Sequence, residues 1–112
     1  MIRKILLVGV LAMWTGSAIA AEPIEGDWKT EAGDTARIAP CAQSFCITLV
    51  NGKYAGKMIG QLKGNGGLYN GQITDPKDNK TYEGSAAVTG NNLKLQGCVL
   101  KVFCKSQIWT RL

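Results

Sequence analysis

The stretch LYNGQITDPKDNKTYEGSAAVTGNNLKLQ, which spans residues 68–96, gives the clearest indication of the fold class. Its apolar and small residues recur at every second position: Tyr69, Gly71 and Ile73, then Tyr82, Gly84, Ala86 and Val88, and finally Leu93 and Leu95. A period of two is typical of a β-strand with one dry face and one wet face. Because the turn-forming segments 75–79 and 90–92 separate the three runs, the stretch predicts three antiparallel strands joined by short turns.

The same alternation continues on both sides of this stretch. Turn signals include Asn51-Gly52, which favours a tight type I′ hairpin, and the glycine-rich segment 64–67. We expect no helix after Ala21 and eight strands, at residues 26–31, 35–39, 45–50, 53–62, 68–74, 80–89, 92–97 and 103–111. Because no helix covers the apolar face, the sheet is expected to close into an eight-stranded antiparallel up-and-down barrel, which also removes its exposed edges.

The first twenty residues have the features of a secretory signal peptide. Arg3 and Lys4 precede an apolar run over residues 5–14, and Ala18-Ile19-Ala20 provides a cleavage site. A membrane-spanning helix needs about 20 apolar residues, so a permanent anchor is the weaker alternative. We therefore expect cleavage near Ala20, one small domain over residues 21–112, and a periplasmic location.

The charge of the remaining chain is only mildly positive. Without residues 1–20, the 112-residue chain keeps 92 residues with 11 of its 13 basic and all 8 acidic side chains, a net charge of +3. Its basic residues are scattered between Lys29 and Arg111 rather than clustered. This pattern and export argue against nucleic-acid binding, and we expect a monomer without stable membrane insertion.

Four cysteines, Cys41, Cys46, Cys98 and Cys104, are expected to form disulfides in an exported protein. Three pairings are possible. Each close pair flanks an expected hairpin bend, which favours Cys41–Cys46 and Cys98–Cys104 over the other two pairings. Neither spacing matches a Cys-x-x-Cys redox centre, and a zinc site would need reduced cysteines and often histidine, which the chain lacks.

The two ends of the domain share a possible contact. Gly26-Asp27-Trp28 opens the first expected strand and Trp109-Thr110-Arg111 closes the last. Barrel closure would bring Arg111 over the Trp28 ring, an attraction of roughly 0.5–2 kcal/mol, and would plug one end of the barrel. The alternative is a solvated Arg111 near a frayed terminus. The signature formed by Gly26, Trp28, Trp109 and Arg111 resembles that of the calycin superfamily, which includes lipocalins.

A more specific resemblance covers nearly all of residues 21–112. It is carried by residues 24–30, the Cys41 and Cys46 pair, residues 75–84 and residues 97–111. These segments resemble a family of small exported bacterial proteins that is catalogued as a domain of unknown function and considered lipocalin-like. That family often has glycine where Asn79 stands and a longer connection after the second cysteine. The resemblance implies a fold and a compartment, but no established ligand.

The chain offers little for catalysis. Without histidine, a serine nucleophile lacks its usual general base, and disulfides would occupy every thiol. The carboxylates Glu25 and Asp27 have no established glycosidase geometry, and Asp75 and Asp78 are better explained as turn residues. A weak calcium site at Asp75, Asp78 and Asn79 is a minor alternative. We therefore expect a protein that is not an enzyme and has no cofactor, catalytic site or metal site.

Two functions from different classes follow. The leading hypothesis is a binding module that holds a small apolar or amphipathic ligand in or at the mouth of the barrel, with interior candidates Trp28, Ile73, Tyr82, Val88, Leu93 and Leu95. The alternative is a protein-binding, inhibitor-like module, whose disulfide-braced bends present Phe45, Leu100 and Phe103 to an envelope protein. A cavity would favour the first hypothesis, and exposed apolar bends would favour the second.

Overall fold

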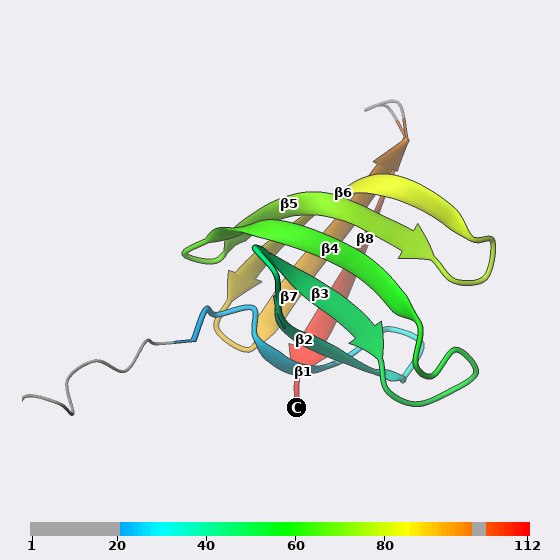
Figure 1. Ribbon diagram of the computed structural model, residues 1–112, viewed down its shortest axis with the longest axis horizontal. Coiled ribbons are helices and arrows are strands. Elements are labelled where there is room, and N and C mark those ends of the chain that lie inside the picture. The colour runs from blue at the N-terminus through cyan, green and yellow to red at the C-terminus, as the bar shows by residue number, and fades with distance from the viewer. Residues whose placement is uncertain (1–20, 100–102) are drawn as a thin grey trace, which may run out of the picture.

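The computed structural model describes residues 21–99 and 103–112. They form eight strands: β1 (Gly26–Lys29), β2 (Thr35–Cys41), β3 (Ser44–Leu49), β4 (Met58–Asn65), β5 (Leu68–Asp75), β6 (Lys80–Thr89), β7 (Asn92–Val99) and β8 (Phe103–Arg111). Each strand pairs antiparallel with its neighbours in the chain, and β1 pairs with β8, so the sheet closes into a barrel (Figure 1). The prediction of an all-β, eight-stranded up-and-down barrel is confirmed. The expected signal peptide, residues 1–20, lies outside the described residues.

The connection between β3 and β4 differs from the prediction. The expected strand over residues 53–62 is confirmed over residues 58–62, but its predicted start and the tight type I′ turn at Asn51 are wrong, because an eight-residue loop over residues 50–57 precedes β4. Asn51 Oδ1 accepts a hydrogen bond from Thr35 N at 2.8 Å, so this side chain fastens the loop to the start of β2. Tyr54 at the middle of the loop packs against the core. These tertiary contacts outweigh the local turn preference.

The two ends of the barrel are built differently. One end, which we call the closed end, carries the short turns after β2, β4 and β6 and the segment 22–25 that precedes β1. The other, the open end, carries the β1–β2 turn, the β3–β4 loop and the β5–β6 turn. Figure 1 shows the N-terminal segment, in blue, reaching the barrel beside the closed-end turns.

The core consists of inward-facing side chains from all the strands and from the N-terminal segment. Its buried members are Ile24, Trp28, Ala36, Ile38, Ile47, Leu49, Ile59, Leu62, Tyr69, Ala86, Leu93, Leu95 and Trp109. Small residues make room where the wall is crowded: a Cβ added at Gly84 would lie 2.3 Å from Ile73 Cδ1. The small inward positions are therefore packing sites for their neighbours.

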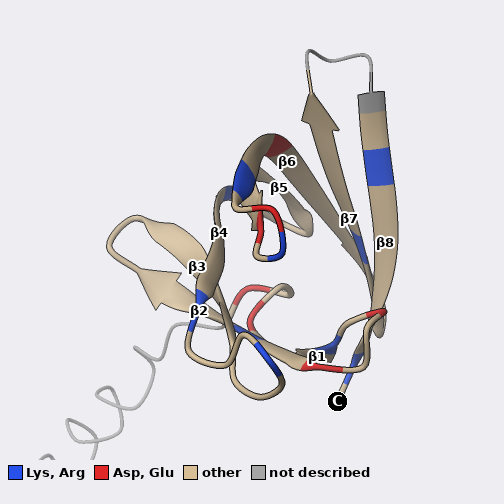
Figure 2. Ribbon diagram, turned by 90° about the vertical axis from the view of Figure 1, so that its right-hand side faces the viewer, with Lys and Arg blue, Asp and Glu red and all other residues tan. Residues whose placement is uncertain are grey.

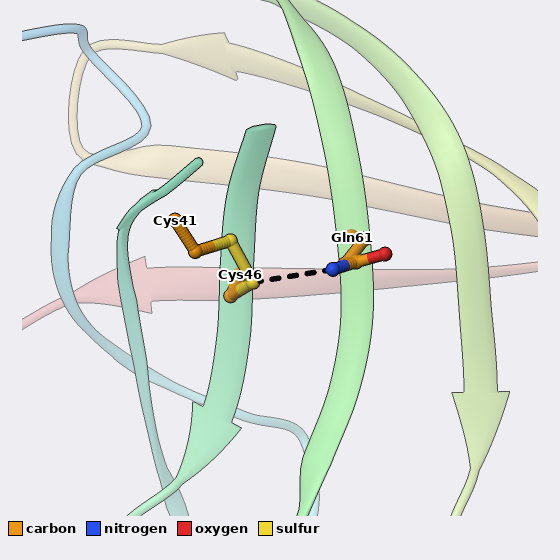
Figure 3. Close-up of a disulfide and its surroundings, with 3 residues drawn as sticks. All are labelled: Cys41, Cys46 and Gln61. Carbon is orange, nitrogen blue, oxygen red and sulfur yellow. Dashed lines mark hydrogen bonds between the residues drawn. A yellow bond between two sulfur atoms is a disulfide. The ribbon is translucent and has the colours of Figure 1, made fainter. Parts of the chain in front are cut away.

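Both disulfides brace hairpins. Cys41–Cys46 joins β2 to β3, Cys98–Cys104 joins β7 to β8, and no cysteine within the described ranges is free. Figure 3 shows that Gln61, on β4, donates a hydrogen bond from Nε2 to Cys46 Sγ at 3.6 Å. The first disulfide is thus tied to a third strand.

None of the residues in the described ranges belongs to a helix long and apolar enough to cross a bilayer.

Candidate functional site

The segment 22–25 seals the closed end. Ile24 is fully buried, and its carbonyl oxygen accepts a hydrogen bond from Trp28 Nε1 at 2.9 Å. Glu22 Oε1 accepts hydrogen bonds from the Tyr69 hydroxyl at 2.8 Å and from Gly66 N at 2.9 Å. The segment is therefore held to the β4–β5 turn and to the core at once, and the protein's own side chains fill this end.

Arg111 joins the last strand to the same segment. Its guanidinium carbon lies 4.2 Å from the centroid of the Trp28 ring. Two of its nitrogens donate hydrogen bonds to the carbonyl oxygens of Glu25, at 3.1 Å, and of Pro23. Arg111 is partly buried by these contacts, and it covers the tryptophan at the closed end rather than extending into solvent.

The surroundings shift the pKa values of Tyr69 and Asp27. Burial raises the pKa of Tyr69, and the hydrogen bond to the Glu22 carboxylate raises this pKa further. On the outer surface, the hydrogen bond from Arg37 lowers the pKa of Asp27, to which Arg37 Nε lies 2.9 Å away. The Tyr69 hydroxyl therefore stays protonated and remains a donor to Glu22 well into the alkaline range.

The open end contains a pocket of about 300 Å³. Buried apolar side chains form its floor, namely Leu49, Ile59, Leu95 and Trp109. Tyr54, Ile73 and Tyr82 add its walls, and polar residues of the surrounding turns and of β8 form its rim. This volume is at the lower end of the range of small-molecule sites, about 300–1,000 Å³.

One residue of the pocket lining carries a polar atom without a protein partner. Within the described part of the chain, Thr30 Oγ1 is the buried side-chain oxygen or nitrogen that lacks a hydrogen bond. The backbone of Thr30 is engaged, since its N–H donates to Asp34 O at 2.9 Å and its carbonyl accepts from Gly33 N at 3.0 Å. An unpaired buried hydroxyl costs roughly 1–3 kcal/mol of stability.

Three of the six predicted ligand-binding residues line this pocket: Ile73, Tyr82 and Leu95. The other three do not, because Trp28 and Leu93 are fully buried core residues and Val88 packs against the core near the closed end of β6. Alternation along a strand assigns a side chain to the inner face, but it carries no information on depth along the barrel axis.

Of the three residues of the protein-binding alternative, the structure describes the side chain of Phe45. Phe45 is half-buried and packs edge-on against Tyr69, with ring centroids 5.6 Å apart, so it does not project from the first disulfide-braced bend. Leu100 and the side chain of Phe103 lie outside the described residues.

Several lining residues were not predicted, chiefly Thr30, Tyr54, Ile59 and Gln107. Thr30 follows Trp28 by two positions, so extending the period of two from Trp28 could have identified it. Tyr54 had no such signal, because it reaches the pocket from an irregular loop.

Two of the carboxylates considered as acid pairs or metal ligands, Asp75 and Glu25, accept hydrogen bonds from nearby backbone N–H groups. Asp75 Oδ1 accepts a hydrogen bond from Lys77 N at 2.9 Å, as a turn residue does, and Glu25 Oε2 accepts one from Glu22 N at 2.8 Å. Asn79 completes the β5–β6 turn with a φ of 57°, a conformation that glycine and asparagine adopt most readily. In residues 21–99 and 103–112, no three histidine, cysteine, aspartate or glutamate side chains are grouped as metal ligands.

Comparison with known proteins assigns the family. A family model described as "Uncharacterized protein conserved in bacteria (DUF2147)" matches residues 55–111, just over half of the chain. The chain belongs to this family. The match covers β4–β8 of the DUF2147 barrel, with the pocket residues Ile73, Tyr82 and Leu95 and the second disulfide. Neither a curated protein nor a solved structure matches the chain. Two disulfides in a small domain of a bacterial family are consistent with an exported protein.

Proposed function

We propose that this DUF2147 protein is a non-enzymatic binding module that holds one small amphipathic molecule in the open-end pocket. The observation that carries the proposal is the pocket of about 300 Å³ with a buried apolar floor and a polar rim. Small-molecule sites have this composition, in which apolar walls supply affinity and a few polar groups set the orientation. The ligand is therefore a molecule with an apolar body against this floor and a polar group at the rim.

The proposal includes a periplasmic, monomeric, calycin-like protein. The signal-like sequence over residues 1–20 and the two disulfides support export, and the contact between Trp28 and Arg111 supports the calycin-like assignment. Intact-mass analysis of purified protein tests the compartment. We expect a mass that lacks residues 1–20 and four thiol hydrogens, whereas a retained leader with four free thiols would refute export.

Native mass spectrometry of protein purified from its own bacterial envelope tests ligand binding. Gly97 lines the pocket, and a Cβ added there would meet Tyr82 Cβ at 3.4 Å, an ordinary contact. Gly97→Ala therefore adds little volume, whereas Gly97→Met extends a side chain into the cavity. We expect a one-to-one adduct on the wild type and on Gly97→Ala, and none on Gly97→Met. A wild type without an adduct, or an adduct that persists on a folded Gly97→Met variant, would refute the proposal.

A further inference from the structure

The seam between β1 and β8 is short. β8 pairs with β7 from Asn92↔Thr110 to Val99↔Phe103, but it pairs with β1 only at Trp28↔Arg111 and Lys29↔Thr110. After Lys29 the chain turns away, and Figure 2 shows β7 and β8 continuing past β1 as a projecting hairpin. The projecting half of β8 therefore has a strand partner on one side only among the described residues.

Two observations show which backbone groups face this free edge. In an antiparallel ladder, the Cα atoms of a hydrogen-bonded pair are about 5.5 Å apart and those of a non-hydrogen-bonded pair about 4.5 Å. The Cα atoms of Cys98 and Cys104 are 4.0 Å apart, so these residues form a non-hydrogen-bonded pair. The N–H and C=O groups of Cys104 therefore point away from β7. Independently, Ile108 N donates to Glu31 Oε2 at 2.8 Å on the β1 side. Since these directions alternate along a strand, the N–H and C=O groups of Ser106 also face the free edge.

We propose that the free edge over residues 104–106 binds an extended peptide segment of another protein by strand addition. An extended chain is the partner whose alternating donors and acceptors match those of Cys104 and Ser106. The Cys98–Cys104 disulfide holds the hairpin in strand form before binding, which lowers the entropic cost of association. This inference rests on the backbone of β8 and is independent of the pocket ligand.

Lys105 indicates the chemistry of the partner. Its side chain lines the pocket rim on the inner face of β8, is exposed, and forms no salt bridge to the described residues. Opposite charges directly across a strand pair stabilise the pairing, and like charges destabilise it. The residue of the added strand that lies opposite Lys105 is therefore acidic.

A second copy of the chain is a poorer occupant of this edge. Consider two β8 strands that pair across a two-fold axis. The N–H and C=O groups of Cys104 and Ser106 would all form hydrogen bonds only if Cys104 of one copy lay opposite Ser106 of the other. That register places the two copies of Lys105 directly opposite each other, which is unfavourable. Charge complementarity thus favours an acidic peptide over self-association.

The probe is the blocked peptide acetyl-Thr-Val-Glu-Val-Thr-amide, titrated into the ¹⁵N-labelled, oxidised protein and followed by NMR. We expect saturable shifts and slowed hydrogen exchange at the amides of Cys104 and Ser106. A peptide with lysine in place of glutamate should bind roughly threefold to tenfold more weakly, because it places like charges opposite each other. Methylation of both valine nitrogens should abolish binding, because these N–H groups would pair with β8.

Ser106→Pro removes a donor from the free edge and leaves the β7–β8 ladder intact, with Ser106→Ala as the matched control. We expect peptide binding to be lost in Ser106→Pro and kept in Ser106→Ala, while the pocket adduct is the same in both. The proposal is overturned by no saturable binding, by equal binding of the glutamate and lysine peptides, or by binding of the N-methylated peptide. A concentration-dependent dimer that Ser106→Ala retains and Ser106→Pro dissociates would assign the edge to a second copy and overturn it as well.

Discussion

Arg111 stabilises the closed end through three contacts. They are the stacking on Trp28 and two hydrogen bonds to carbonyls of the segment 22–25. A cation–π contact contributes roughly 0.5–2 kcal/mol and a hydrogen bond from a charged donor about 1.5–3 kcal/mol. Because the bond to Pro23 is exposed to solvent, we count only the stacking and the bond to Glu25, and expect Arg111→Ala to lower the free energy of unfolding by roughly 2–5 kcal/mol. Arg111→Lys should lose part of this stabilisation, because an ammonium group is not planar and cannot stack on the ring or donate two hydrogen bonds in the geometry of a guanidinium.

Urea denaturation measures the effect, with Arg37→Ala as the control. Arg37 pairs with Asp27 on the exposed surface, where ion pairs contribute little, so its removal should leave the midpoint unchanged. Equal midpoints for Arg111→Ala and Arg37→Ala would contradict the role assigned to Arg111.

Tyr69 makes stability dependent on alkaline pH. Burial and Glu22 raise its pKa above the ordinary value of about 10, so the unfolded chain loses this proton first as the pH rises. The stabilisation by Tyr69 is therefore fully present below about pH 10 and is lost as the pH rises through the folded pKa. We expect Tyr69→Phe to be about 1 kcal/mol less stable than the wild type at neutral pH, with a gap that narrows above about pH 10. Urea titrations across this range would show a constant or widening gap if the argument were incorrect.

The Thr30 hydroxyl should lower the stability of the fold. It is buried without a partner in the described structure, so Thr30→Val should stabilise the protein by about 1 kcal/mol. Thr30→Ser keeps the hydroxyl and should not gain this stability. Thermal unfolding measures the effect. A Thr30→Val variant less stable than the wild type would show that the hydroxyl serves the fold.

At the scale of the elements, the second disulfide governs the projecting β7–β8 hairpin. Closing such a short loop stabilises by about 2 kcal/mol in the chain-entropy model. We expect replacement of Cys98 and Cys104 by serine to cost about this much and to speed amide exchange within the hairpin. The matched replacement of Cys41 and Cys46 should cost a similar amount and leave exchange in the β7–β8 hairpin unchanged. Uniform loss of protection in both variants would indicate that the hairpin is not a separate unit.

Strand prediction succeeded where alternation and turn chemistry agree. The strands Lys80–Thr89 and Phe103–Arg111 match the predicted bounds. The first has a clear turn signal on each side and alternates throughout, whereas the second follows an expected bend that the two cysteines flank. The β3–β4 loop was mispredicted, because the contacts of Asn51 with Thr35 and of Tyr54 with the core depend on strands distant in sequence. Local pattern therefore determines which residues are strands, but not how an irregular loop is held.

At the scale of the whole molecule, one mismatch in length explains both ends of the barrel. β1 has four residues and β8 has nine, so the two strands meet only beside the closed end. There the N-terminal segment and Arg111 complete the seal. At the other end the missing length of β1 leaves the pocket mouth beside the free edge of β8. The open and closed ends are therefore consequences of where the chain turns after Lys29.

The candidate site could be predicted only in part for the same reason. Ile73, Tyr82 and Leu95 follow from alternation, but alternation also selected Val88 and Leu93, which lie outside the pocket. Depth in the barrel depends on strand stagger and on the segment 22–25, which no periodic pattern encodes. The pocket therefore emerges only when all the strands are assembled.

A crystal structure of the protein purified from its own envelope, without added ligand, shows directly whether the open-end pocket holds a ligand. We expect electron density for one small molecule in this pocket, with an apolar part against Leu95 and Trp109 and a polar part at the rim. An interior filled by the protein's own side chains, with no cavity at the open end, would contradict the proposed function.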